Sequence, residues 1–113
     1  MRNNIDVRLK EALKNLAANS SEQKAYLEKL GTAPSADELA LEFDDIYLPL
    51  KSWIEGGSVK LPPNLILKLE EVDNLLEKMS GPQNAKLWDV KSLSSNEWNH
   101  IRRIAGEALL LIS

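Results

Sequence analysis

The sequence contains no cysteine, a single histidine and only six aromatic residues among its 113 positions. Without cysteine, the chain forms no disulfide and offers no thiolate zinc site or cysteine nucleophile. Long hydrophobic runs are also lacking, because the longest, 108–112, is far shorter than the roughly 18 residues that a bilayer-spanning helix needs. The first residues carry no apolar signal-peptide core. We therefore expect a cytoplasmic protein that does not contact membranes.

A basic surplus is absent too, because 14 Lys and Arg stand against 17 Asp and Glu, for a net charge of −3. The sequence pI of 5.2 lies far below the value above roughly 9 that is typical of nucleic-acid-binding domains. The only adjacent pair of bases is Arg102–Arg103. Acidic residues gather in the middle of the chain, where 35–55 holds six acids and one lysine. We expect no nucleic-acid partner.

The residue counts favour helices over strands. Leucine occurs twenty times and alanine ten, whereas the β-branched valine, isoleucine and threonine together occur twelve times. Apolar residues also recur at spacings of three and four. The sequence therefore predicts an all-α, single-domain bundle of four to five helices over 1–113. The expected helices cover 4–18, 21–30, 35–55, 62–79 and a last stretch that begins after Ser94.

The apolar stripe of each expected helix defines a predicted core. Its members are Ile5, Leu9, Ala12, Leu13, Leu16, Tyr26, Leu27, Leu30, Leu39, Phe43, Ile46, Leu50, Trp53, Leu65, Leu69, Val72, Leu76, Trp98, Ile101, Ala105, Ala108 and Ile112. Residues 82–94 follow no helical pattern, and we expect an irregular connection whose apolar side chains hold it to this core. These are Leu87, Trp88, Val90 and Leu93.

Local signals place the helix ends and one distortion. Capping-box patterns predict N-termini at Ser20 with Gln23, Ser35 with Glu38, and Ser94 with Glu97. Gly31 and Pro34 mark the end of the second helix. Pro49 lies within the stripe of the central helix, and it cannot donate a hydrogen bond to the carbonyl of Asp45. We expect a kinked central helix, or a break, near Pro49.

An acidic stripe runs along this central helix. Glu38, Glu42 and Asp45 are spaced i, i+4 and i+7, so they share one side of the helix beside its apolar face. Such a stripe is typical of a solvated surface, but it also suits the steering of a basic partner. Di-metal carboxylate bundles combine such acids with two Glu-x-x-His motifs, and this chain has only one, from Glu97 to His100, so we expect neither a metal site nor a cofactor.

Several leucines lie away from the predicted core faces. Leu41 and Leu48 are about 160–180° from Leu39 around the helix, at 100° per residue. The other members of this set are Leu67, Leu75 and Leu110. Either the central helix is buried on both sides, or these leucines form an exposed patch for a partner or for a homodimer.

The single histidine offers the only catalytic alternative. His100 is followed by Arg103, three residues on. This spacing in an all-helical chain of about this length resembles the histidine phosphotransfer domains, in which an exposed histidine accepts a phosphoryl group. That family has a small residue directly after the base, where this chain has Ile104. The resemblance implies a phosphoacceptor role for His100, assisted by Arg103.

Together these features favour a non-enzymatic protein–protein interaction module without catalytic residues. We expect an adaptor, or an inhibitor of the immunity-protein type, that binds a basic protein through Glu38, Glu42, Asp45, Leu41 and Leu48. The first alternative is a phosphotransfer module that uses His100 and Arg103, and the second is a structural subunit that associates with itself through the off-face leucines.

Overall fold

The chain folds into a bundle of helices. In this computed structural model, residues 2–30 and 36–112 are described, with only the backbone of 2–5. This part of the chain contains no strand, which confirms the predicted all-α class, and it adds two 3₁₀ helices to the five expected helices. The elements are α1 (Arg2–Ala17), α2 (Ser20–Lys29), α3 (Asp37–Glu55), α4 (Pro63–Lys78), η1 (Pro82–Trp88), η2 (Val90–Ser94) and α5 (Asn96–Leu111).

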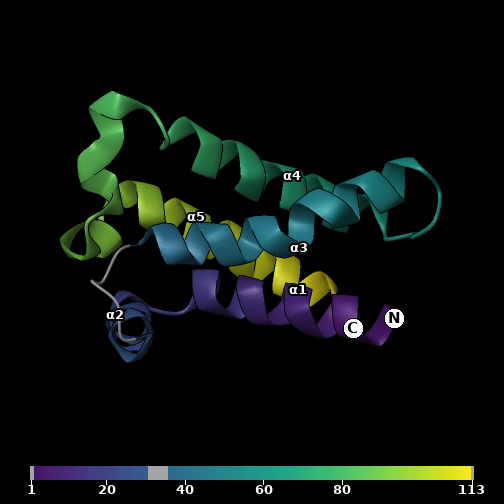
Figure 1. Cartoon of the computed structure of the whole chain (residues 1–113), viewed down its shortest axis with the longest axis horizontal. Helices are drawn as coiled ribbons and strands as arrows, with labels where there is room; N and C mark the ends of the chain where they lie inside the picture. The colour runs from purple at the N-terminus through teal and green to yellow at the C-terminus, as the bar shows by residue number, and fades with distance from the viewer. Residues whose placement is uncertain (1, 31–35, 113) are drawn as a thin grey trace.

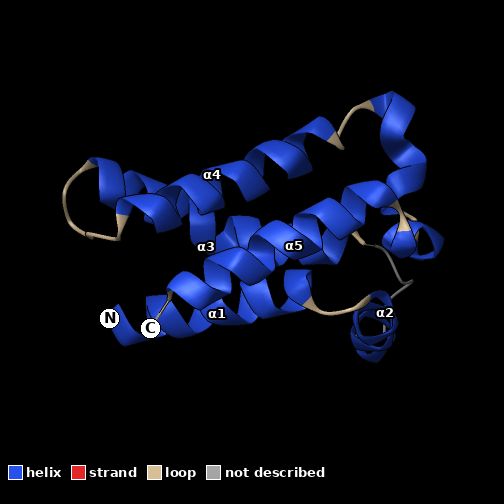
Figure 2. Cartoon of the chain, turned by 180° about the vertical axis from the view of Figure 1, so that it is seen from behind, coloured by secondary structure: helices blue, strands red, loops and turns tan. Residues whose placement is uncertain are grey.

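Four long helices form an open ring. α1 and α5 run antiparallel against each other, α3 packs on α1, and α4 packs on α5 (Figures 1 and 2). α3 and α4 touch much less, although they are consecutive in the chain. α2 is drawn nearly end-on in both views, so it crosses the end of the bundle opposite the start of α1. The ring is therefore open between α3 and α4.

The predicted stripes form the core of this bundle. The side chains of Leu13, Leu39, Leu69 and Ile101 are completely buried. Every other predicted core residue with a described side chain is buried or packs against the core, except Leu30, which is exposed. The side chain of Ile5 lies outside the described residues. The burial of these stripes stabilises helices that are too short to persist alone in water.

The central helix α3 continues through Pro49 without a break. The helix axis bends on the way from Asp37 to Glu55, as Figure 1 shows. A break is unnecessary, because Leu50, directly after Pro49, is completely buried and holds the second half of the helix to the core. The prediction of a kink is therefore confirmed, and the alternative of a break is wrong.

Two of the predicted N-caps are displaced by one residue. Asn19 caps α2 by accepting a hydrogen bond from the backbone N–H of Glu22, and it donates to the Glu22 carboxylate at 2.8 Å. Ser95, not Ser94, caps α5. In both cases the neighbouring serine offers the same chemistry, so the sequence pattern fits two adjacent registers. Ser35, Gly31 and Pro34 lie outside the described residues.

The predicted irregular connection is wrong, because 82–94 consists mainly of η1 and η2. Its apolar residues nevertheless hold it to the core: Leu93 is buried, while Leu87, Trp88 and Val90 are half-buried against the core. The indole N–H of Trp98 donates to the carbonyl of Leu87 at 2.7 Å. This ordered connection closes one end of the gap between α3 and α4.

Candidate functional site

The opening between α3 and α4 is a groove on the surface. Two hollows of about 490 and 290 Å³ share Ala40, Asp44, Ser80 and Trp88, so they form one continuous depression. We call it the α3–α4 groove. It is lined by Asp37, Ala40, Leu41, Asp44, Leu48, Asp73, Leu76, Glu77, Ser80, Gly81, Pro82, Ala85 and Trp88.

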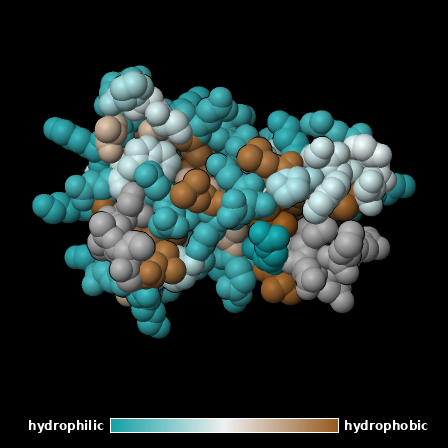
Figure 3. All heavy atoms as spheres, viewed as in Figure 1, coloured by the Kyte–Doolittle hydropathy of each residue, from teal (hydrophilic) through white to brown (hydrophobic). Residues whose placement is uncertain are grey.

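The α3 wall of this groove is a second face of the central helix. Leu41, Asp44 and Leu48 are spaced i, i+3 and i+7, and they lie opposite the core stripe. Leu41 is 52% exposed and Leu48 is 57% exposed, so the central helix is not buried on both sides. Figure 3 shows hydrophobic spheres among hydrophilic ones in the area of α3 and α4. The groove therefore presents apolar surface to solvent.

The α4 wall is set by the burial of that helix against α5. Val72 and Leu76 are buried. The residues directly after them, Asp73 and Glu77, therefore lie at the edge of α4 that faces α3. Among the described residues that line the groove, the four carboxylates of Asp37, Asp44, Asp73 and Glu77 are accompanied by no Lys or Arg. The result is an apolar groove with acidic residues on both walls.

Two of these carboxylates, Asp44 and Asp73, lie in an environment that disfavours their charge. Burial, followed by the charges of Asp73 and Asp45, raises the pKa of Asp44 above its usual value. Burial also raises the pKa of Asp73, with Glu77 adding to the increase and Lys51 opposing it. The side chains of Asp44, Asp73 and Glu77 form no hydrogen bond or close ion pair with another described residue. The groove thus concentrates negative charge, which Lys51 offsets only in part at Asp73.

The closed end of the groove is held in place by Trp88. Its indole N–H donates to the carbonyl of Met79 at 2.7 Å, and its own carbonyl accepts from the backbone N–H of Ala36 at 3.0 Å. The ring of Trp88 also packs edge-on against that of Trp98, with 5.5 Å between the centroids. Trp88 therefore links α4, α3 and α5 at one position, which makes the end wall rigid.

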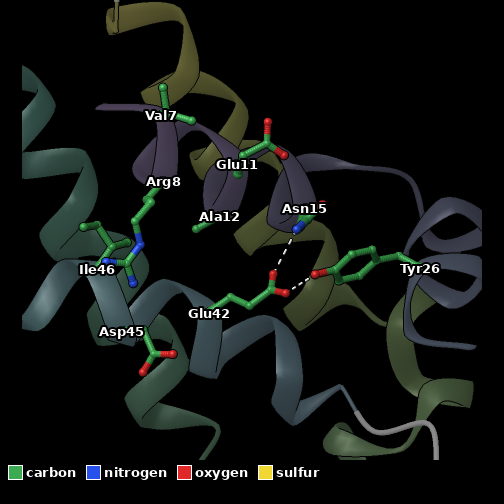
Figure 4. A pocket seen from close by; sticks show the side chains of 9 residues that line it. All are labelled: Val7, Arg8, Glu11, Ala12, Asn15, Tyr26, Glu42, Asp45 and Ile46. Atoms are coloured by element: carbon green, nitrogen blue, oxygen red, sulfur yellow. Dashed lines mark hydrogen bonds between the residues drawn. The ribbon is translucent and has the colours of Figure 1, made fainter. Parts of the chain in front are cut away.

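A second hollow, of about 460 Å³, lies on the other side of α3, between α1, α2 and α3 (Figure 4). There the carboxylate of Glu42 accepts hydrogen bonds from the side-chain amide of Asn15, at 2.9 Å, and from the hydroxyl of Tyr26. The hydrogen bond to Glu42, together with burial, raises the pKa of Tyr26 to about 12. Glu42 therefore ties three helices together.

The structure divides the predicted binding residues between two faces. Glu42 and Asp45 line the hollow of Figure 4, and Glu38 lies close enough to Tyr26 for its charge to raise the pKa of that hydroxyl. Leu41 and Leu48 line the α3–α4 groove instead. The five residues therefore do not share one surface, because α3 packs between the two sets. The acids that accompany the exposed leucines are Asp37 and Asp44.

The remaining off-face leucines do not join the groove. Leu67 is 64% exposed and Leu110 is 86% exposed, and neither lines a hollow described above. Leu75 is half-buried and packs against the core beside His100. The five off-face leucines therefore do not form one continuous patch.

The predicted phosphoacceptor pair is on the surface. His100 and Arg103 are exposed on α5, and Ile104 is buried, so its bulk points away from this surface. His100 lines a small hollow that also contains Lys78 and Glu97. The geometry thus leaves both side chains accessible.

Arg102, the other half of the basic pair, is used inside the fold. Its guanidinium donates to the carbonyls of Ala18 and Leu93, at 2.7 and 2.8 Å, and to the side-chain oxygen of Gln23. Gln23 is itself buried and donates to the carbonyl of Leu16. These bonds join α1, α2, η2 and α5. Arg102 is therefore occupied, which leaves only Arg103 of the pair for any anionic partner.

Sequence reasoning did not identify Asp73, Glu77 or Trp88 as site residues. α4 gives one available signal, because Asp73 and Glu77 are spaced i, i+4 directly after the core positions Val72 and Leu76. Nothing in the sequence indicates that this edge faces α3. In the described part of the chain, no three His, Cys, Asp or Glu residues form a group that could hold a metal ion.

Comparisons with protein-family models, curated proteins and solved structures gave no match to this chain. None of the described helices is both long enough and apolar enough to cross a membrane.

Proposed function

We propose that this chain is a non-enzymatic protein–protein interaction module, an adaptor or an inhibitor, that binds a basic partner in the cytoplasm. One observation carries the proposal: Asp44, Asp73 and Glu77, whose side chains form no hydrogen bond or close ion pair with another described residue, lie beside the exposed leucines of the α3–α4 groove. A basic partner would neutralise Asp44 and Asp73 and cover Leu41 and Leu48 in the same step. Electrostatic complementarity of this kind accelerates association and selects the partner.

We place the proposed binding surface in the α3–α4 groove and not on the acidic stripe of Glu38, Glu42 and Asp45. Reversing the charge of Glu42 would break its hydrogen bonds to Asn15 and Tyr26. A loss of partner binding in that variant could then come either from a lost contact with the partner or from a damaged fold. Asp44 and Glu77 make no such bonds, and they lie on opposite walls of the groove. These two residues therefore give the cleaner test.

The test compares two double variants of the full chain. Asp44→Lys/Glu77→Lys and the control Asp6→Lys/Glu28→Lys each change the net charge from −3 to +1, the control at exposed positions on α1 and α2. We expect the immobilised wild type and the control to capture the same basic protein from an extract of the native cell. The groove variant should lose it. Equal capture by both variants would contradict the proposal.

The phosphotransfer alternative rests on the accessibility of His100 and Arg103. It stays a prediction, and it needs a phosphodonor whose phosphoryl group is transferred to the imidazole. Incubation with such a donor, followed by an assay for acid-labile phosphate in wild type and His100→Gln, checks it. A label that persists in the variant would contradict the alternative.

A further inference from the structure

The shape and the charge of the α3–α4 groove define its occupant more closely, on the basis of the proposed function. We propose that the groove binds an amphipathic basic helix of a partner protein. The leucines of the partner helix would lie along Leu41, Leu48 and Trp88, with lysines or arginines on both of its flanks. Docked in this way, the helix would complete the ring of helices on its open side (Figures 1 and 2).

The spacing of the apolar residues on α3 favours a helical occupant. Leu41 and Leu48 are seven residues apart, which is two turns or about 10.5 Å along the helix. A docking helix repeats apolar side chains at the same interval, so it can place one beside each leucine. The described part of the chain has no strand, so the walls offer no β-edge to an extended peptide.

The charges on the two walls explain why the occupant must be basic on both flanks. Asp37 and Asp44 belong to the α3 wall of the groove, and Asp73 and Glu77 belong to the α4 wall. An apolar helix without charges would leave the carboxylates of Asp44, Asp73 and Glu77 partly desolvated and without a hydrogen-bond or ion-pair partner, which costs free energy. Bases on both flanks instead offset the raised pKa values of Asp44 and Asp73.

The same charges argue against a second copy of this chain as the occupant. In a symmetric dimer the same surface patch of both copies meets, so four carboxylates would face four others. Like charges brought together in this way are repulsive. A basic helix of another protein would neutralise the negative charge of the groove, whereas a second copy of this chain would double it.

The test uses a synthetic helical peptide of about 18 residues, which spans about 27 Å and fits within the 39 Å length of the molecule. Its leucines form one stripe with lysines on both flanks. A scrambled peptide of the same composition, with the leucines spread around the helix, is the control. Binding is measured by titration calorimetry and helix formation by circular dichroism.

Two leucine variants of the full chain locate the site. Leu41→Ser/Leu48→Ser removes the apolar contacts of the groove, and Leu67→Ser/Leu110→Ser removes two leucines of equal or greater exposure elsewhere. We expect the striped peptide to gain helicity on binding, and its affinity to fall about tenfold or more in the groove variant only. The scrambled peptide should bind more weakly to the wild type.

Three outcomes would overturn the inference. Equal binding of the striped and the scrambled peptide would reject the helix as the occupant. Failure of both peptides to bind, while the capture of a basic protein still depends on Asp44 and Glu77, would also reject it. Either result would leave the proposed function standing. A wild-type dimer in sedimentation that dissociates in Leu41→Ser/Leu48→Ser would make a second copy the occupant. If the charge variants also capture the same proteins as the wild type, the proposed function fails as well.

Discussion

At the scale of single residues, the molecule uses its polar groups in two different ways. Arg102, Gln23 and Glu42 are bonded within the fold and join helices to one another. Asp44 and Asp73 are half-buried without such bonds, in positions where their charges repel. Unpaired carboxylates in a partly desolvated site lower stability, and proteins commonly accept this cost where a site must bind something.

Replacement of Asp44 by Asn should therefore stabilise the free protein. Because the pKa of Asp44 is higher in the folded chain than its usual 3.8, the folded state binds more protons than the unfolded state just above pH 3.8. The wild type loses stability as the pH rises through that window, and at neutral pH Asp44→Asn should be more stable by about 0.5 kcal/mol. Urea denaturation at neutral pH and near pH 3 measures the difference, which should shrink at low pH. A less stable variant at neutral pH would contradict the expectation.

At the scale of elements, α3 is the helix with two functions. One face, including Leu39 and Phe43, builds the core, and the opposite face lines the groove with Leu41 and Leu48. α3 packs on α1 and touches α4 little, so the second face remains open. The leucines of the core face therefore stabilise the fold, whereas the leucines of the groove face contribute little to the free energy of unfolding.

Alanine substitutions on the two faces should separate these contributions. Leu39→Ala removes a completely buried side chain and should cost about 2–5 kcal/mol, because it leaves a cavity in the core. Leu41→Ala, two residues away on an exposed position, should change the free energy of unfolding by no more than about 0.5 kcal/mol. Chemical denaturation followed by far-ultraviolet circular dichroism measures both. Similar costs at the two positions would mean that Leu41 is covered in solution.

At the scale of the whole molecule, charge is distributed unevenly over an otherwise ordinary bundle. The net charge is only −3, but the described residues that line the groove include four carboxylates and no Lys or Arg. A cleft lined by one sign of charge attracts the opposite charge from a distance and accelerates association. Salt screens this attraction, because the Debye length falls from about 10 Å at 0.1 M to about 3 Å at 1 M.

Binding of the striped basic peptide should accordingly depend on both salt and pH. Raising the salt from 0.1 to 1 M should slow association about tenfold or more, with a smaller change in dissociation. Acidification protonates Asp44 and Asp73 and removes their attraction for lysine. Because their pKa values are raised, this loss should begin at a higher pH than for an ordinary aspartate. Stopped-flow fluorescence over a series of salt and pH conditions tests both. Association rates that are insensitive to salt would exclude steering by the groove.

The sequence alone determined the helices and their inner faces, because apolar periodicity and the scarcity of β-branched residues are local properties of the chain. It also showed that Leu41 and Leu48 leave the core face, since 100° per residue defines directions around one helix axis. Only the tertiary structure decided which neighbour each face meets. It set Glu42 against Tyr26 and Asn15, and it set Asp73 and Glu77 across from Asp44. The packing of four helices around a common core is a property of the whole chain, and the spacing of residues within one helix does not encode it.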